Sequence, residues 1–198
     1  MKDFKIKLEF QEPLLGTASA NPELYEEFIA SKAPEGMNQD ELDSLPDVEK
    51  EIQKGTTIFH RNTDDQPVIY DYQIKGFFKD ACGMLRRVVG TRSKALKAYK
   101  KEIDGLVFVT PRRALLVLPE GGVMDFNTRP LRAQTAQGER VSLARSEQAP
   151  IGTTVEFEVS CLRDGLLPLV EEWLDYGKLR GLGQWRNASY GRFTYTIE

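Results

Sequence analysis

Three separate segments alternate apolar and polar side chains, and this alternation constrains the fold most strongly. Residues 4–10, 153–162 and 192–197 each place apolar side chains at every second position. A period of two is that of a strand with one buried face. Residues 74–89 and 166–176 instead gather their apolar side chains on one side of a helix. The chain is therefore predicted to be an α+β protein.

The remaining elements suggest how these strands and helices are connected. Residues 106–109 and 114–118 read as strands, and the turn-forming residues between them predict a hairpin. Gly90 is expected to end the first helix, and Ser93 to cap a second helix that reaches about Ile103. The resulting order is the β-α-β-β-α-β arrangement of a ferredoxin-like (RRM-like) core. A length of 198 residues favours one domain, residues 1–198.

Residues 17–55 interrupt this order between the first strand and the first core helix. Asn21 followed by Pro22 marks a helix start, and Pro46 separates two further short helices. Residues 1–60 carry 6 Lys/Arg and 13 Asp/Glu, a net charge of −7. We expect an acidic helical insertion that packs against a partner subunit or covers one face, because its charge disfavours contact with nucleic acid.

Positive charge gathers in the rest of the chain. Residues 61–198 carry 21 Lys/Arg and 17 Asp/Glu, and residues 75–113 carry 11 basic against 3 acidic side chains, a net charge of +8. Such segregation indicates a surface that faces a polyanion, although a solvated helix face is the alternative for the lysines of 94–101. The candidate nucleic-acid contacts in this stretch are Lys75, Lys79, Arg86, Arg87 and Arg92.

A glycine-rich segment, residues 177–193, lies between the last helix and the last strand. Glycine lets a backbone approach a ligand closely, arginine makes multidentate contacts to phosphate, and aromatic rings stack on bases. The combination predicts binding to a single strand of nucleic acid. In the alternative reading the glycines only turn a tight connection, and the tryptophan packs on the sheet. The candidate binding residues are Arg180, Gly181, Gly183, Trp185, Arg186, Tyr190, Gly191 and Arg192.

Catalysis, metal binding and cofactor binding have little support in the sequence. His60 is the one histidine, and cleavage of RNA by a histidine base needs a second group to protonate the leaving oxygen. Tyr70, Tyr72 or a lysine are candidates for that group. Cys82 and Cys161 stand in apolar contexts and are expected to be buried free thiols. We expect no metal and no cofactor.

The sequence shows no pattern for membrane insertion. It has no apolar run near the roughly 20 residues that a membrane span requires. Its first residues enter a strand pattern directly, so no signal peptide is expected. We therefore expect a cytoplasmic protein.

Four segments, in the same order along the chain, resemble the RAMP (repeat-associated mysterious protein) superfamily, the RNA-binding subunits of CRISPR systems. The most specific comprises Gly181-Leu182-Gly183, Arg186 and residues 190–193, which is similar to the family's C-terminal glycine-rich loop. The approach to the first helix is also similar, but the serines of the family's Pro-Gly-Ser-Ser-x-(Lys/Arg)-Gly pattern are missing. The three supporting segments are residues 4–16, 65–81 and 149–159.

The resemblance implies the same ferredoxin-like fold and a role in antiviral defence. It implies a non-catalytic module that binds single-stranded RNA (guide or crRNA-like), as a backbone subunit of a CRISPR effector does. Other CRISPR subunits or defence proteins are then partners, through residues 17–55. One alternative is a RAMP-like, metal-independent endoribonuclease that processes repeat RNA with His60. Another is a protein of a virus or mobile element that mimics such a subunit and binds host defence machinery.

Overall fold

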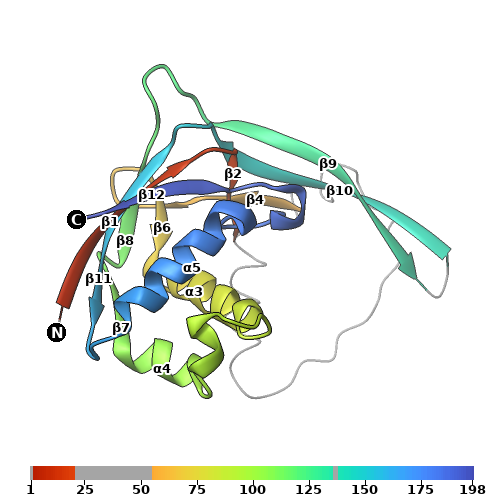
Figure 1. Cartoon of the computed structure of the whole chain (residues 1–198). Coiled ribbons are helices and arrows are strands. Elements are labelled where there is room, and N and C mark those ends of the chain that lie inside the picture. Colours follow the sequence, from red (N-terminus) through yellow and green to blue (C-terminus); the bar gives the residue numbers. More distant parts are fainter. Residues whose placement is uncertain (1, 21–54, 136–137) are drawn as a thin grey trace, which may run out of the picture.

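The computed structural model describes residues 2–20, 55–135 and 138–198 and has an α+β fold, as predicted (Figure 1). Strand β1 (Lys2–Phe10) lies second from one edge of the main sheet. It pairs in antiparallel fashion with β12 (Phe193–Ile197) on one side and with β11 (Thr154–Cys161) on the other. These are the three segments with alternating side chains, so this part of the prediction is confirmed.

The main sheet continues beyond β11 in a way that differs from the expected hairpin. Both β7 (Val107–Thr110) and β8 (Arg113–Val117) pair with β11, at successive positions along it. The two strands therefore follow one another along β11 and pair with it, where a hairpin would have paired them with each other. The sheet ends with β6 (Pro67–Tyr70) and β5 (His60–Arg61), which follow β8 in the order.

Three helices lie against one face of this sheet (Figure 1). They are α3 (Asp71–Leu85), α4 (Tyr99–Leu106) and α5 (Leu167–Arg180). The apolar positions of β1 and β11 face the buried sides of α3 and α5, and together they form the core. The largest fully buried side chain is that of Trp173, whose Nε1 donates a hydrogen bond to Ser93 Oγ over 2.9 Å.

The two expected helix boundaries differ from the structure for identifiable reasons. Helix α3 ends at Leu85 rather than at Gly90, and Thr91 Oγ1 lies within hydrogen-bond distance of the carbonyl oxygens of Leu85 and Val88. The expected capped helix after it is divided into the 3₁₀ helix η1 (Arg92–Ala95) and α4. Ser93 does not cap a long helix because its hydroxyl is bonded to the Trp173 indole and to a carboxylate of α5.

A second sheet lies beside the main one. Its long hairpin, β9 (Asp125–Thr135) and β10 (Gly138–Ala149), extends away from the helices (Figure 1). Three short strands complete it: β2 (Leu14–Leu15), β3 (Ala18–Ser19) and β4 (Thr56–Ile58). Of the expected acidic helical insertion at 17–55, residues 21–54 lie outside the described residues, and the part at its start that is described forms β3, a strand.

Close packing between α5 and β12 depends on the absence of a side chain at Gly177. A Cβ atom at this buried position would lie 2.1 Å from Phe193 Cζ and 2.8 Å from Phe77 Cζ. Phe193 is itself 1% exposed and makes edge-to-face contacts with Phe10 and Phe77. The ring of the first residue of β12 therefore occupies the space that a Cβ atom would take on α5.

We predict that Gly177→Ala destabilises the protein by about 1–3 kcal/mol, the usual cost of overpacking a core. The same substitution at Gly105 in α4, where a Cβ atom meets nothing within 4 Å, is expected to stabilise by up to about 1 kcal/mol because alanine is the better helix former. Chemical denaturation of both variants measures the difference. Equal stabilities would show that the α5–β12 contact is looser than described.

Candidate nucleic-acid interface

The glycine-rich segment is closed on itself by two glycines that lie against each other's backbone. Gly181 ends α5 with φ of 79°, and a Cβ atom there would lie 2.3 Å from the Tyr190 carbonyl oxygen. Gly191 has φ of 71°, and its Cβ atom would lie 2.0 Å from the Leu182 carbonyl oxygen. The Leu182 N–H donates to the Gly191 carbonyl over 2.9 Å. The two glycines therefore let one part of the segment's backbone approach another part. This is what the alternative interpretation of the sequence expects, in which the glycines turn a tight connection.

One side chain ties the segment to the second sheet. Gln184 Nε2 lies within hydrogen-bond distance of the Gly16 carbonyl oxygen, of Thr57 Oγ1 at 2.6 Å and of Ser146 Oγ at 3.0 Å. These partners come from the chain after β2, from β4 and from β10. All three partners belong to or directly follow strands of the second sheet, so this one side chain holds the segment against that sheet.

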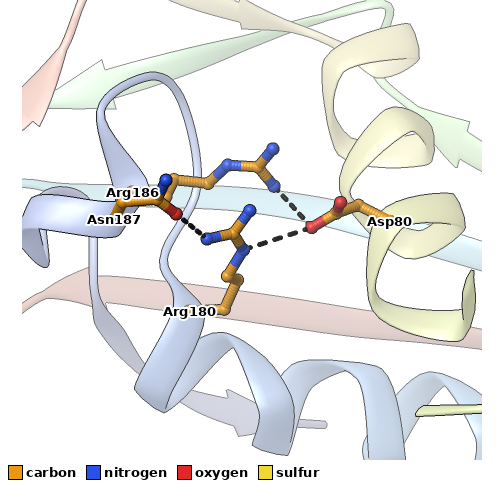
Figure 2. Close-up of polar contacts among 4 residues, drawn as sticks. All are labelled: Asp80, Arg180, Arg186 and Asn187. Atoms are coloured by element: carbon orange, nitrogen blue, oxygen red, sulfur yellow. Dashed lines mark hydrogen bonds and ion pairs between the residues drawn. The ribbon is translucent and has the colours of Figure 1, made fainter. Parts of the chain in front are cut away.

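Two arginines of the segment converge on one carboxylate of α3 (Figure 2). Asp80 Oδ2 lies 2.7 Å from Arg186 Nη1 and 3.5 Å from Arg180 Nε. Arg180 Nη1 also donates to Asn187 Oδ1 over 2.6 Å. All three charged side chains are about one-quarter exposed. The Asp80 carboxylate lets two guanidinium groups lie side by side, and the cluster keeps a net charge of +1.

The third arginine of the segment has a different partner. Arg192 Nε donates to the Leu179 carbonyl oxygen over 2.9 Å. That carbonyl is one of the last in α5, where the helix leaves its acceptors without partners of its own. Arg192, predicted as a phosphate contact, therefore closes the end of a helix with at least one of its donors.

Two of the aromatic residues of the segment, Trp185 and Tyr190, lie in one stack. The Trp185 and Tyr190 rings are 4.8 Å apart and 20° from parallel, and the guanidinium carbon of Arg129 lies 4.5 Å from the centre of the Trp185 ring. Trp185 is 39% exposed and is not part of the core. A base that stacks on Trp185 would extend this existing stack or displace one of its members.

Arg129 of β9 is a buried cation that sequence reasoning did not single out. It is 8% exposed, and burial lowers the pKa of its guanidinium. Its hydrogen bonds go to the neutral Ser146 Oγ, at 3.1 Å, and Asn127 Oδ1, at 3.4 Å. Within the described residues no carboxylate pairs with it. Its place in an alternating, arginine-containing strand was the available signal, but alternation does not reveal which arginine turns inward.

The basic residues of 75–113 lie on several sides of α3 and its neighbours. Lys79 pairs with Asp104 at 2.5 Å, and Lys75 Nζ donates to the Asp104 carbonyl, so these two lysines face α4. The Arg86 guanidinium lies over the Tyr99 ring. The side chains of Arg87 and Arg92 are exposed. Asp80 connects residues 75–113 to the glycine-rich segment through its ion pairs with Arg180 and Arg186. The pattern of charges in the sequence did not predict these ion pairs.

Of the candidate proton donors named from the sequence, Tyr72 is hydrogen-bonded to His60. His60 Nε2 lies 3.2 Å from the Tyr72 hydroxyl, and the Tyr70 ring contacts its imidazole edge-on at 4.7 Å. Burial lowers the pKa of the imidazole, which favours the neutral ring at neutral pH. Burial also raises the pKa of the buried Cys82 and Cys161 thiols, and thiols held in the neutral form are weak nucleophiles.

Among the residues that the structure describes, no group of three or more His, Cys, Asp or Glu side chains is placed to hold a metal ion. Within the same residues, no helix combines the length and apolar character that crossing a membrane requires.

Comparison with known proteins finds a similar overall fold in a chain of a CRISPR complex. Neither a protein-family model nor a curated protein sequence matches the chain. Among solved structures, it is similar to a chain in the cryo-EM structure of the Type III-B Cmr-beta bound to cognate target RNA, with a TM-score of 0.56 and 16% identity. The match covers 99% of this chain and 59% of that chain, so this chain spans somewhat over half of its length. At this level of identity the likeness is one of overall fold.

A second similar structure is that of a Type IV-B CRISPR complex. Its TM-score is 0.48 and its sequence identity 12%, over 100% of this chain and 90% of that chain.

We predict that Trp185→Ala costs about 1–2 kcal/mol of stability, the combined size of an aromatic pair and a cation–π contact. The control is Trp173→Ala in the core, which is expected to cost about 3–5 kcal/mol because it leaves a large cavity. Thermal melting of the two variants separates the cases. A loss at Trp185 as large as that at Trp173 would mean that the stack serves the core and not a ligand.

Proposed function

We propose that this chain is a non-catalytic subunit of a CRISPR-type complex and binds single-stranded RNA through its glycine-rich segment. Its core is then ferredoxin-like. The strand order β12-β1-β11 followed by β7 and β8, with α3 and α5 on one face, supports that arrangement. The observation that carries the proposal is the Arg180–Asp80–Arg186 cluster, in a fold similar to a chain of an RNA-bound complex.

The arginine cluster suits a phosphodiester group. Each guanidinium has five N–H donors in a planar fork, and the contact of Arg186 with Asp80 uses one of them. The Asp80 carboxylate reduces the repulsion between the two cations and still leaves a positive charge. A phosphate that binds there makes the cluster neutral, because its single negative charge balances the remaining positive one. Asp80 is therefore a positioning residue for both arginines.

Single-stranded RNA fits the aromatic stack better than a duplex does. Unpaired bases can be splayed out and stacked on aromatic or guanidinium planes, whereas the bases of a duplex already stack on each other. Trp185 and Tyr190 supply such planes, and Trp185 directly precedes Arg186 of the arginine cluster. Lys75, Lys79, Arg86, Arg87 and Arg92 extend the proposed contact along α3 and beyond it.

We also propose that residues 1–198 form one domain that acts in the cytoplasm. The acidic segment 17–55 would then meet another subunit of the complex or a defence protein. The negative charge of this segment repels RNA and attracts a basic protein surface. RNA binding and protein binding would then use different parts of the chain.

We predict that Arg180→Ala and Arg186→Ala each weaken the binding of a labelled single-stranded RNA. Each variant is expected to flatten the dependence of log K on log salt by about 0.7, because one cation that displaces counterions is lost. Fluorescence polarisation at two salt concentrations measures both effects. Wild-type protein is expected to bind duplex DNA more weakly than the single strand.

The control for these variants is Arg163→Ala. Arg163 pairs with Glu102 over 2.8 Å and lies outside the glycine-rich segment, so its loss removes the same charge and is expected to leave the salt dependence unchanged. Absence of binding at low salt, or equal affinity for the duplex, would contradict the proposed function.

The His60–Tyr72 contact is the one observation that favours the endoribonuclease alternative. A neutral imidazole can accept a proton from a 2′-hydroxyl, and a phenol can donate one to a leaving oxygen. In the structure, however, these two groups are bonded to each other at 3.2 Å. The imidazole nitrogen and the phenol hydroxyl that would contact RNA are therefore hydrogen-bonded to each other instead.

We predict that RNA incubated with the protein stays intact, with or without divalent metal. Denaturing gel electrophoresis of end-labelled RNA makes the measurement. Cleavage that disappears in His60→Ala and in Tyr72→Phe would instead establish the enzyme. Cleavage that persists in both variants would indicate a contaminating nuclease.

A further inference from the structure

A cavity of about 670 Å³ opens beside the glycine-rich segment. Its walls come from β2, β3, β5, β6, α3 and the glycine-rich segment. Most of its lining is apolar, as in typical sites for small organic ligands, which range from roughly 300 to 1,000 Å³. The apolar walls include Leu14, Leu15, Phe59, Phe77 and Leu182.

Polar groups line two parts of this cavity. Arg186, which the Asp80 carboxylate holds in place, lines it from the glycine-rich segment. The hydrogen-bonded pair His60 and Tyr72 lines it from β5 and α3. The cavity therefore combines apolar walls with a fixed cation and with ring and hydroxyl groups that both donate and accept hydrogen bonds.

We propose that this cavity receives one unpaired nucleobase, whose phosphate binds Arg186. The inference rests on the proposed RNA binding and adds to it a site for a base. A nucleobase has two apolar faces and a polar edge, so its faces suit the aliphatic and phenyl walls and its edge suits the imidazole and the phenol. An aliphatic ligand without an anionic group would make no use of the positive charge that the Arg180–Asp80–Arg186 cluster retains.

A free mononucleotide has the same chemistry as a base in a strand. Both carry a planar ring one sugar away from a phosphate. The two sources are distinguished by testing a short RNA, a sugar-phosphate strand of the same length without bases, and a set of mononucleotides.

The substitution that fills the cavity is Gly76→Leu. Gly76 lines the cavity from the middle of α3, and a Cβ atom there meets nothing within 4 Å. Leucine forms helices better than glycine, so this variant is expected to fold at least as stably as the natural protein. Gly105→Leu in α4 is the matched control, since its Cβ atom also meets nothing within 4 Å and it does not line the cavity.

Gly76→Leu is expected to weaken the binding of the short RNA by roughly 5- to 150-fold, the range for the loss of one well-stacked base. It is expected to leave the affinity for the strand without bases unchanged, because Arg180 and Arg186 still bind its phosphates. Gly105→Leu is expected to bind both strands as the natural protein does. Binding of mononucleotides that Gly76→Leu abolishes would add the free nucleotide as a ligand of the same cavity.

Three outcomes would overturn the inference. Gly76→Leu could bind RNA as tightly as the natural protein, it could lose both strands equally, or it could melt well below the Gly105→Leu control. In each case the natural protein still binds RNA, so the proposed function stands and only the base site fails. If the natural protein binds neither strand, the proposed function fails as well.

Discussion

The ring of Phe193 against Gly177 is the contact on which the glycine-rich segment depends. Gly177 lies one turn before the end of α5, and Phe193 is the first residue of β12. Because the ring fills the space of the missing Cβ and touches Phe77 of α3, the end of α5, the start of β12 and α3 meet at one point. Both ends of the segment between them are thereby fixed, and so is the distance to Asp80.

Charge near the segment is arranged in two contrasting ways. Arg180 and Arg186 share one carboxylate and stay partly exposed, whereas Arg129 is buried against a tryptophan ring and neutral hydrogen-bond acceptors. A shared carboxylate orients cations and keeps them available to an anion. A buried guanidinium is costly to desolvate, so the stack over Arg129 depends on the contacts of β9 and β10 that surround it.

The sequence predicted those parts of the structure that depend on local periodicity. Alternation located β1, β11 and β12, because a strand with one buried face repeats every two residues wherever it pairs. It did not distinguish a hairpin at 106–118 from two strands that follow one another along β11, since both have the same period. The contacts of Asp80 were beyond it too. Asp80 lies about a hundred residues from its arginines, and only the packing of α3 against α5 brings them together.

The crossing of Gly181 and Gly191 has a consequence for the thermodynamics of ligand binding. A loop whose two ends are locked backbone against backbone loses its conformational entropy when the protein folds. A ligand that later meets its side chains does not bear that cost, which is the advantage of a preorganised site. The segment therefore presents its side chains to a ligand from a backbone that is already ordered.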